Sequence, residues 1–278
     1  MKRRVLLAGL GSLALSRLVK AQSVPEAPAL YVGHGGPNLG TARRHGAELA
    51  AWADTLPAAS GVLAITPHVR SRGVELSAVG PGRALMSFPR SFLPRSGPQR
   101  YGSPDSSVLA AGVAELLRAQ GPVRTEETGM NHTVWQPLLH MLPRAEVPVV
   151  QLALPFGFSD RELFELGSHL APLRRRGVWL LASGNLTHNL GGMGSAEPPA
   201  WARRFDEWVA TRLTDWDLEA VVDWRRAAPT PYLAHPDDGG HFDVLLVVLG
   251  AAAQENRRVS FGLESFSGGL SKRCIRIG

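Results

Sequence analysis

The 278-residue chain contains a single cysteine, Cys274. One cysteine excludes an intramolecular disulfide, and it also excludes a zinc or iron–sulfur site built from several thiolates. A metal bound by this chain would therefore take histidine and carboxylate ligands. Hydrophobic residues make up 44% of the sequence, which is enough to form a core and argues against a largely disordered chain.

Two common catalytic signatures are also missing. The turn His34-Gly35-Gly36 follows an apolar run and resembles the oxyanion-hole motif of lipases and esterases, but the chain has no Gly-x-Ser-x-Gly pentapeptide to supply the nucleophile. The sequence therefore disfavours a serine hydrolase. Gly9-Leu10-Gly11 lacks the third glycine of a dinucleotide-binding turn, and it lies in an N-terminal segment of a different character.

The net charge of the chain gives little support to nucleic-acid binding. The charge is +6, but five of the basic side chains lie within residues 1–21, which hold no acidic residue, so the rest of the chain carries only +1. This charge is too small for an electrostatic footprint on DNA or RNA. We therefore expect no nucleic-acid partner.

Residues 1–21 have the composition of an export signal. A basic start, Lys2-Arg3-Arg4, precedes an apolar stretch over 5–15, and Ala21 is an acceptable cleavage position. The arginine pair partly matches a twin-arginine signal. The apolar stretch is too short to span a bilayer comfortably, so we expect no stable membrane insertion. The segment predicts a periplasmic protein, with an ordinary N-terminal helix and a cytoplasmic location as the alternative.

Strand and helix patterns alternate along residues 29–278. Short apolar runs, such as 29–32 and 61–66, have the length of buried strands, and segments such as 105–120 show the period of helices. Residues 159–162 match a capping box that opens another helix. We find no internal repeat and no clear linker. The sequence predicts one α/β domain over 29–278, a sandwich with a largely parallel central sheet flanked by helices.

Five of the nine histidines stand where an apolar run gives way to glycine, proline, asparagine or aspartate. They are His34, His68, His132, His188 and His241. Because the carboxyl ends of parallel strands meet at one edge of a sheet, histidines at such ends can converge on a single site. Imidazole is a common transition-metal ligand and the usual acid or base near neutral pH. The set predicts a metal-dependent enzyme.

The neighbouring residues support a functional role for each of these five histidines to a different degree. His34 and His68 each follow a strand-like run, and two histidines from neighbouring strand ends can share one metal. The other three lie in polar loops, where a histidine without a role is an open alternative. We expect no catalytic role for the remaining histidines, which are His45, His140, His169 and His235.

Taken in order, the segments around the five histidines resemble motifs of the class III extradiol ring-cleavage dioxygenases, in particular the 4,5-DOPA dioxygenase branch. The family's Gly-His-Gly-Ser-Pro turn corresponds to Gly33-His34-Gly35-Gly36-Pro37, and its Ser-Ala-His-Trp motif to Thr66-Pro67-His68-Val69. Its Asp-His-Gly-x-Trp motif corresponds to Asn131-His132-Thr133-Val134-Trp135. The loop over 182–190 and the tail that starts at His241 also match, so the likeness extends from residue 29 to the C-terminus.

The resemblance implies a role for each histidine. His34, His68 and His241 would bind a metal. His188 would line the same pocket as an acid and base or as a further ligand, and His132 would contact the substrate or dioxygen. The cofactor would be Fe(II), with Zn(II) possible in the same site. The enzyme would act on a small aromatic diol and dioxygen, and extradiol cleavage of the catechol ring would give a muconic-semialdehyde-type product.

Three departures from the family pattern concern the expected site. The family's Pro-x-x-Glu-His tail becomes 236–241, one residue longer, in which Asp237 or Asp238 is the candidate to replace the glutamate. Asn131 stands where the family has an aspartate. The family's substrate loop is replaced by residues 86–104, and arginines beside a catechol site would favour a carboxylated substrate. The arginines of this loop are Arg90, Arg95 and Arg100.

The sequence therefore predicts an exported, iron-dependent extradiol dioxygenase. Two alternatives use the same residues. One is a non-catalytic relative that keeps the fold and binds a metal or ligand, and the other is a zinc-dependent hydrolase. Retention of all five histidines favours an enzyme, whereas the altered neighbours of His68, His132 and His241 keep the non-catalytic alternative open. The physiological catechol, the native metal and the oligomeric state do not follow from the sequence.

Overall fold

The computed structural model describes residues 26–36, 39, 42–78, 86–87, 101–127, 129–193, 195–254 and 258–278. The expected export signal at residues 1–21 lies outside the described residues, and so do Arg90, Arg95 and Arg100. Within the described part of the chain, no helix has the length and apolar character needed to cross a bilayer.

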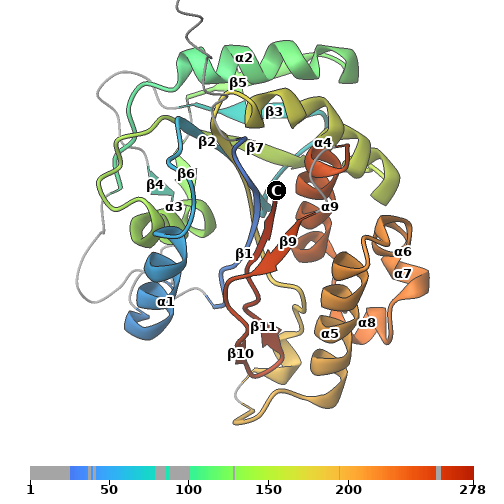
Figure 1. Cartoon of the computed structure of the whole chain (residues 1–278). Coiled ribbons are helices and arrows are strands. Elements are labelled where there is room, and N and C mark those ends of the chain that lie inside the picture. Colours follow the sequence, from blue (N-terminus) through green and yellow to red (C-terminus); the bar gives the residue numbers. More distant parts are fainter. Residues whose placement is uncertain are drawn as a thin grey trace, which may run out of the picture.

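The centre of the fold is an eight-stranded sheet in the order β5-β3-β7-β2-β8-β1-β12-β9 (Figure 1). Its strands are β1 (Ala29–Gly33), β2 (Gly61–Ser71), β3 (Val74–Ser77), β5 (Val123–Glu126), β7 (Val149–Pro155), β8 (Val178–Gly184), β9 (Val259–Phe261) and β12 (Ile275–Ile277). The four middle strands, β7, β2, β8 and β1, run parallel to one another. Antiparallel pairs flank them on both sides, β3 with β7 and β12 with β1 and β9.

The middle strands are apolar because both faces of the sheet are covered. Every residue of β1, β7 and β8 is buried, which is typical of parallel strands between two helical layers. Two small strand pairs lie outside the main sheet. They are β4 (Met86–Ser87) with β6 (Met130–Asn131), and the hairpin of β10 (Phe266–Ser267) and β11 (Leu270–Ser271).

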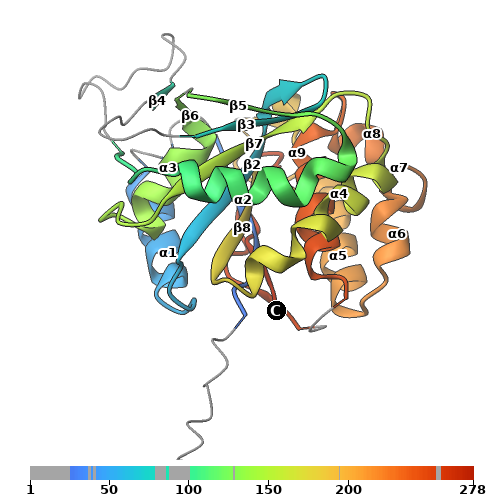
Figure 2. The same ribbon diagram turned by 90° about the horizontal axis from the view of Figure 1, so that it is seen from above.

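Helices cover both faces of the sheet (Figures 1 and 2). On one face, α1 (Arg43–Ala53) and α3 (His132–Met141) share a core with β1, β2 and β8. The core on the other face includes α2 (Ser107–Leu117), α4 (Asp160–Arg174), α5 (Ala200–Thr214) and α9 (Gly240–Ala252). The shorter elements are η3 (Arg118–Gln120), η4 (Leu190–Gly192), α6 (Leu218–Val222), α7 (Trp224–Ala227) and α8 (Pro231–Ala234).

Helix α9 is buried along its whole length and packs against α4 at a distance that requires glycine. A Cβ atom at Gly250 would lie 1.8 Å from the carbonyl oxygen of Phe164, and one at Gly167 would lie 1.9 Å from that of Val247. Both glycines therefore allow the two helix backbones to touch. This packing sets the position of α9, and its first turn carries His241.

The predicted fold class is confirmed, since a largely parallel sheet lies between two helical layers. One expected boundary is wrong. The strand expected over 61–66 continues to Ser71 past an irregularity in register between Thr66 and Arg70, so His68 lies within β2. Helix α3 begins at His132, because Asn131 caps it at that point.

Candidate metal centre

The ends of two strands and one helix bring His34, His68 and His241 together. His34 follows β1, His68 lies near the end of β2, and both strands pair with β8. The carbonyl oxygen of His241 accepts a hydrogen bond from Tyr31 Oη at 2.8 Å. It also lies so close to the end of β8 that a Cβ atom at Gly184 would be 2.2 Å from it. The start of α9 is thus held directly against the carboxyl edge of the sheet.

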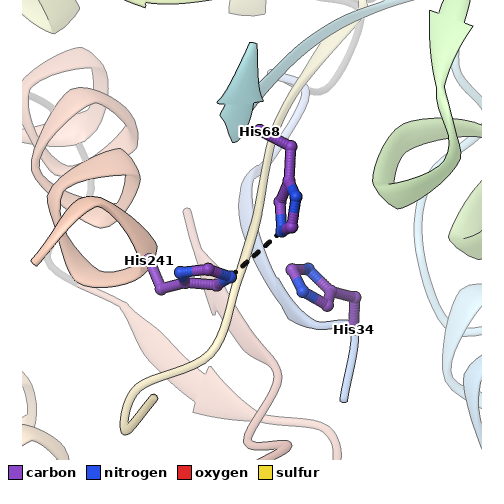
Figure 3. A group of neighbouring side chains, drawn as sticks. All are labelled: His34, His68 and His241. Carbon is purple, nitrogen blue, oxygen red and sulfur yellow. Dashed lines mark hydrogen bonds between the residues drawn. The ribbon is translucent and has the colours of Figure 1, made fainter. Parts of the chain in front are cut away.

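The rings of His34, His68 and His241 point toward one another (Figure 3). Each ring offers one nitrogen, and the three nitrogens lie within 4.8 Å of one another. The Nε2 atoms of His68 and His241 are 3.2 Å apart. Two nitrogens that bind one ion at about 2.1 Å are separated by about 3.0–3.4 Å in octahedral or tetrahedral geometry. The spacing therefore fits one shared transition-metal ion, and we call these residues the three-histidine cluster.

Hydrogen bonds hold His34 and the turn that follows it. Ser183 Oγ donates to the carbonyl oxygen of Thr133, so it accepts from Nδ1–H of His34 at 3.1 Å. This pairing assigns the proton to Nδ1 and leaves the lone pair on Nε2 for a metal. Asn185 accepts from the Gly35 N–H at 2.8 Å and donates to the Gly35 carbonyl at 3.1 Å. Gly35 has a φ of +69°, a conformation that favours glycine.

Burial keeps the three imidazoles neutral. It lowers the pKa of His34 and of His241 well below the ordinary value, and the neighbouring imidazoles lower both further because like charges repel. The pKa of His68 falls to about 4 for the same reasons, because its ring is partly buried against the other imidazoles although the residue as a whole is exposed. Neutral rings keep a lone pair available. The cluster is therefore ready to bind a cation at neutral pH.

His188 stands beside the three-histidine cluster. Its ring stacks on that of His241, with centroids 3.5 Å apart and planes inclined by 8°. Nδ1 of His188 lies 2.9 Å from Oδ2 of Asp237. Because an ionised carboxylate only accepts, Nδ1–H of His188 donates, and in the neutral form of the ring the lone pair is on Nε2. The ligand atoms of His188, Asp237 and His241 also lie within 4.8 Å of one another, as a second group of possible ligands.

The two aspartates of the altered tail have different partners. Asp237 bonds to His188, and it belongs to the second group of possible ligands and not to the three-histidine cluster. Burial would raise the pKa of Asp237, but hydrogen bonds from His188 and from the backbone N–H of Gly239 lower it overall. Asp238 pairs with Arg70 near the surface. Asp237 is thus placed to orient His188.

His132 lies beside His68, with ring centroids 5.3 Å apart. It is the first residue of α3, whose N-cap is Asn131. The Asn131 side-chain oxygen accepts from the backbone N–H of Thr133 at 3.1 Å and from its hydroxyl at 2.8 Å. Asn131 therefore caps the helix that carries His132, in the place where the resemblance leads one to expect an aspartate.

A cavity of about 250 Å³ brings the five predicted histidines together. Its other lining residues are Gly35, Gly36, Thr133, Gln136, Leu190, Met193 and Leu270. Sequence reasoning missed Gln136, although it lies one helical turn after His132 and the helical period would have placed it on the same face. Leu190 and Met193 closely follow His188 in the same loop, whereas Leu270 carried no sequence signal, because tertiary folding alone brings its hairpin to the cavity.

The other histidines are not among the described residues that line this cavity. His45 Nε2 lies 3.0 Å from the carbonyl oxygen of Gly33, and His235 Nε2 lies 2.8 Å from that of Leu186. Both contacts hold the backbone next to the site. His140 makes a similar contact with Leu39, and His169 lies in α4.

Several known proteins are similar to this chain in sequence and in fold. Residues 46–268 match the family described as the catalytic LigB subunit of aromatic ring-opening dioxygenase. The chain is 33% identical over 267 residues to a 4,5-DOPA dioxygenase extradiol of Escherichia coli (strain K12), covering 90% of this chain and 94% of that protein. A protein of the same name from Beta vulgaris is 34% identical over 218 residues, covering 75% and 79% of the two chains.

A solved structure agrees with these matches. The crystal structure of an uncharacterized protein from Escherichia coli K12 has a TM-score of 0.74 and 29% sequence identity, and it covers 91% of this chain and 100% of that chain. The family match spans well over half of the chain, and the two named relatives exceed 30% identity over most of its length. The chain therefore belongs to the family of the catalytic LigB subunit of aromatic ring-opening dioxygenases, in agreement with the resemblance of its motifs.

Proposed function

We propose that this protein cleaves the ring of a catechol with dioxygen at the extradiol position, with a metal held by His34, His68 and His241. The observation that carries the proposal is the convergence of three neutral imidazoles on one cavity, with His188 stacked on His241. Family membership supports the same reaction, because two of its relatives are named extradiol dioxygenases.

We propose Fe(II) as the native metal. A ferrous ion in the three-histidine cluster would supply the one-electron chemistry that allows a spin-paired catechol to react with dioxygen. Sites with three protein ligands and open positions are used by non-haem iron oxygenases. Three imidazoles are also a known donor set for zinc, so Zn(II) is expected to compete for the same residues.

His188 is suited to move the catechol proton. Its Nδ1–H is donated to Asp237, so Nε2 is the atom that can accept a proton from a substrate hydroxyl. Stacking on His241 keeps the ring next to the cluster. The same nitrogen can return the proton later in the reaction, as a general acid. His188 would therefore act as the acid and base.

The α3 wall of the cavity offers polar groups to the substrate or to dioxygen. His132, Thr133 and Gln136 all line the cavity from this helix. The Thr133 hydroxyl also lies 2.6 Å from that of Thr66 in β2, which ties the helix start to the sheet. These contacts hold His132 in place before a substrate enters.

The proposal is tested by loading the metal-free protein with Fe(II) under anaerobic conditions, adding a panel of catechols and then admitting air. Oxygen uptake with a yellow, pH-sensitive product is the expected result. No uptake with any catechol, despite stoichiometric bound iron, would overturn the proposal and favour the non-catalytic alternative. Hydrolysis of an ester or amide that depends on zinc would instead identify a hydrolase.

We also propose that the protein is exported to the periplasm by the twin-arginine route. The support is the basic and then apolar composition of residues 1–21. Expression in a Gram-negative host, followed by fractionation and N-terminal sequencing, should yield a periplasmic protein that starts at Gln22. Replacing Arg3 and Arg4 by Lys should retain it in the cytoplasm. Equal fractionation of both versions would contradict this route.

A further inference from the structure

The two walls of the cavity differ in chemistry. The α3 wall contributes His132, Thr133 and Gln136. The second wall contributes three apolar side chains from outside the main sheet: Leu190 and Met193, in and just after η4, and Leu270 in β11. We call Leu190, Met193 and Leu270 the apolar wall. Leu190 follows His188 by two residues in the same loop.

Two members of the apolar wall are exposed, although they border the site. Leu190 is 59% exposed and Met193 is 49% exposed, whereas Leu270 is 2% exposed. Apolar side chains that remain in water at the edge of a cavity mark a place where a ligand can cover them. Each square ångström of apolar surface so covered is worth about 25 cal/mol. The apolar wall therefore favours a ligand with apolar surface of its own.

Hydrogen bonds hold the first part of this wall in place. The side-chain oxygen of Asn189 accepts from Gly191 N–H at 2.9 Å, and its side-chain nitrogen donates to the carbonyl oxygen of Leu233 at 2.8 Å. Gly269 N–H donates to the carbonyl oxygen of Gly192 at 3.0 Å. The η4 segment and the β10–β11 hairpin are thus joined to each other and to α8.

A buried ion pair anchors the hairpin. Arg273 makes a two-pronged contact with Asp206 of α5, and the Ser271 hydroxyl donates to the same carboxylate. The Thr187 hydroxyl accepts from Ser271 N–H at 2.9 Å, next to His188. The backbone of the wall is therefore set before a substrate binds, so little backbone entropy is lost on binding.

Among the described residues, the cavity lining contains no ionisable side chain other than its histidines, and the apolar wall itself offers no partner for a charged substituent. None of the described lining residues is aspartate, glutamate, lysine or arginine. The nearby Arg70 pairs with Asp238, and Arg225 pairs with Asp160 and Asp243. A carboxylate placed against the apolar wall would lose hydration without gaining an ion pair, which is unfavourable.

We propose that the substrate is a catechol whose ring carries an uncharged, apolar substituent at a carbon remote from the two hydroxyls, and that Leu190, Met193 and Leu270 select it. This inference rests on the proposed function. The diol would lie at the three-histidine cluster with its substituent against the apolar wall. Catechols that carry a carboxylate or an amino-acid group are the disfavoured class, contrary to the substrate that Arg90, Arg95 and Arg100 led us to expect.

The test measures binding without turnover. Zinc-loaded protein is titrated by calorimetry in the absence of air with 4-tert-butylcatechol and, separately, with 3,4-dihydroxybenzoate. We expect the alkyl catechol to bind at least about tenfold more tightly, which corresponds to about 1.4 kcal/mol. Equal or tighter binding of the carboxylate would overturn the inference and favour the arginine-containing loop as the substrate-selecting segment.

Variants of the exposed wall residues assign the preference to this wall. Leu190→Gln and Met193→Gln should each weaken binding of 4-tert-butylcatechol by about 3–10-fold and leave 3,4-dihydroxybenzoate unchanged. Val108→Gln is the control, because Val108 is 86% exposed on α2 and is not a lining residue. Unchanged selectivity in both wall variants would overturn the assignment.

The design separates this inference from the proposed function. Selective binding of the alkyl catechol to the zinc-loaded protein, together with no oxygen uptake by the iron-loaded protein, would support the apolar wall and overturn the dioxygenase proposal. Oxygen uptake by the iron-loaded protein, with 3,4-dihydroxybenzoate as the better substrate, would support the dioxygenase proposal and overturn the inference about the apolar wall. Binding of neither catechol to the metal-loaded protein would overturn both.

Discussion

His188 stacks on His241 with ring centroids 3.5 Å apart, and the same His188 donates from Nδ1 to Asp237 at 2.9 Å. The proposed acid and base is thereby fixed on two sides, by a proposed metal ligand and by a carboxylate. Carboxylates that orient an imidazole in this way assign its tautomer and strengthen the other nitrogen as a base. Asp237 therefore has a positioning role that does not require contact with the substrate.

Asp237→Asn should lower kcat for catechol cleavage by about 10–100-fold, because the amide holds the His188 ring less firmly and in either tautomer. Iron stoichiometry should stay unchanged, since Asp237 lies outside the three-histidine cluster. Asp238→Asn is the matched control, because its partner is Arg70 and not a histidine of the cavity. Oxygen-uptake kinetics and metal analysis measure both effects. A normal kcat in Asp237→Asn would show that Asp237 does not position His188 for catalysis.

The three-histidine cluster predicts that some histidine variants lose the metal and that others keep it. His34→Ala and His241→Ala should each abolish stoichiometric binding of Fe(II) or Zn(II), because two nitrogens hold either ion weakly. His132→Ala should keep the metal and lower kcat by about 10–100-fold, because His132 lines the cavity without belonging to the cluster. Elemental analysis and metal titration, with circular dichroism as a check on folding, measure the outcome. Full metal occupancy in His241→Ala would exclude the proposed ligand set.

The sequence located the five site histidines because each stands where an apolar run gives way to turn or loop residues, and such transitions are local signals. It could not locate the partner of His188, because the bond to Asp237 joins two loops 49 residues apart.

The extent of β2 was missed for a different reason. Pro67 indicated the end of a strand, since proline cannot donate in a ladder. In the structure, pairing of β2 with β8 ends at Ile65, and Pro67 falls in the register irregularity opposite β7.

The contact between α4 and α9 predicts a strong effect at a single glycine. Alanine is favoured over glycine in a helix interior by about 1 kcal/mol, so Gly250→Ala would stabilise an isolated helix. Here the new Cβ would lie 1.8 Å from the Phe164 carbonyl oxygen, a backbone atom that cannot move alone. We expect a net loss of about 2 kcal/mol or more in the free energy of unfolding.

Urea unfolding at pH 7.5 measures that loss, with Gly73→Ala as the control because a Cβ atom at Gly73 would have no neighbouring atom within 4 Å. The control should change stability by less than about 0.5 kcal/mol. Because α9 also carries His241 in its first turn, displacement of the helix by the new Cβ atom should also weaken Zn(II) binding. Equal stability of the two variants would show that the helices separate without penalty.

His235 predicts how stability depends on pH. Burial lowers its pKa to about 4, although hydrogen bonding to Leu186 and the charge of Asp237 act in the opposite direction. The unfolded chain binds this proton near pH 6.5 and the folded chain does not, so stability is fully present above pH 6.5 and falls as the pH drops toward 4. Between pH 7.5 and 5.0 this one group should remove about 2 kcal/mol. His235→Gln keeps a donor toward Leu186 but cannot titrate, so its urea midpoint should fall less over that interval. Parallel pH profiles for the two metal-free proteins would mean that His235 titrates normally in the folded state.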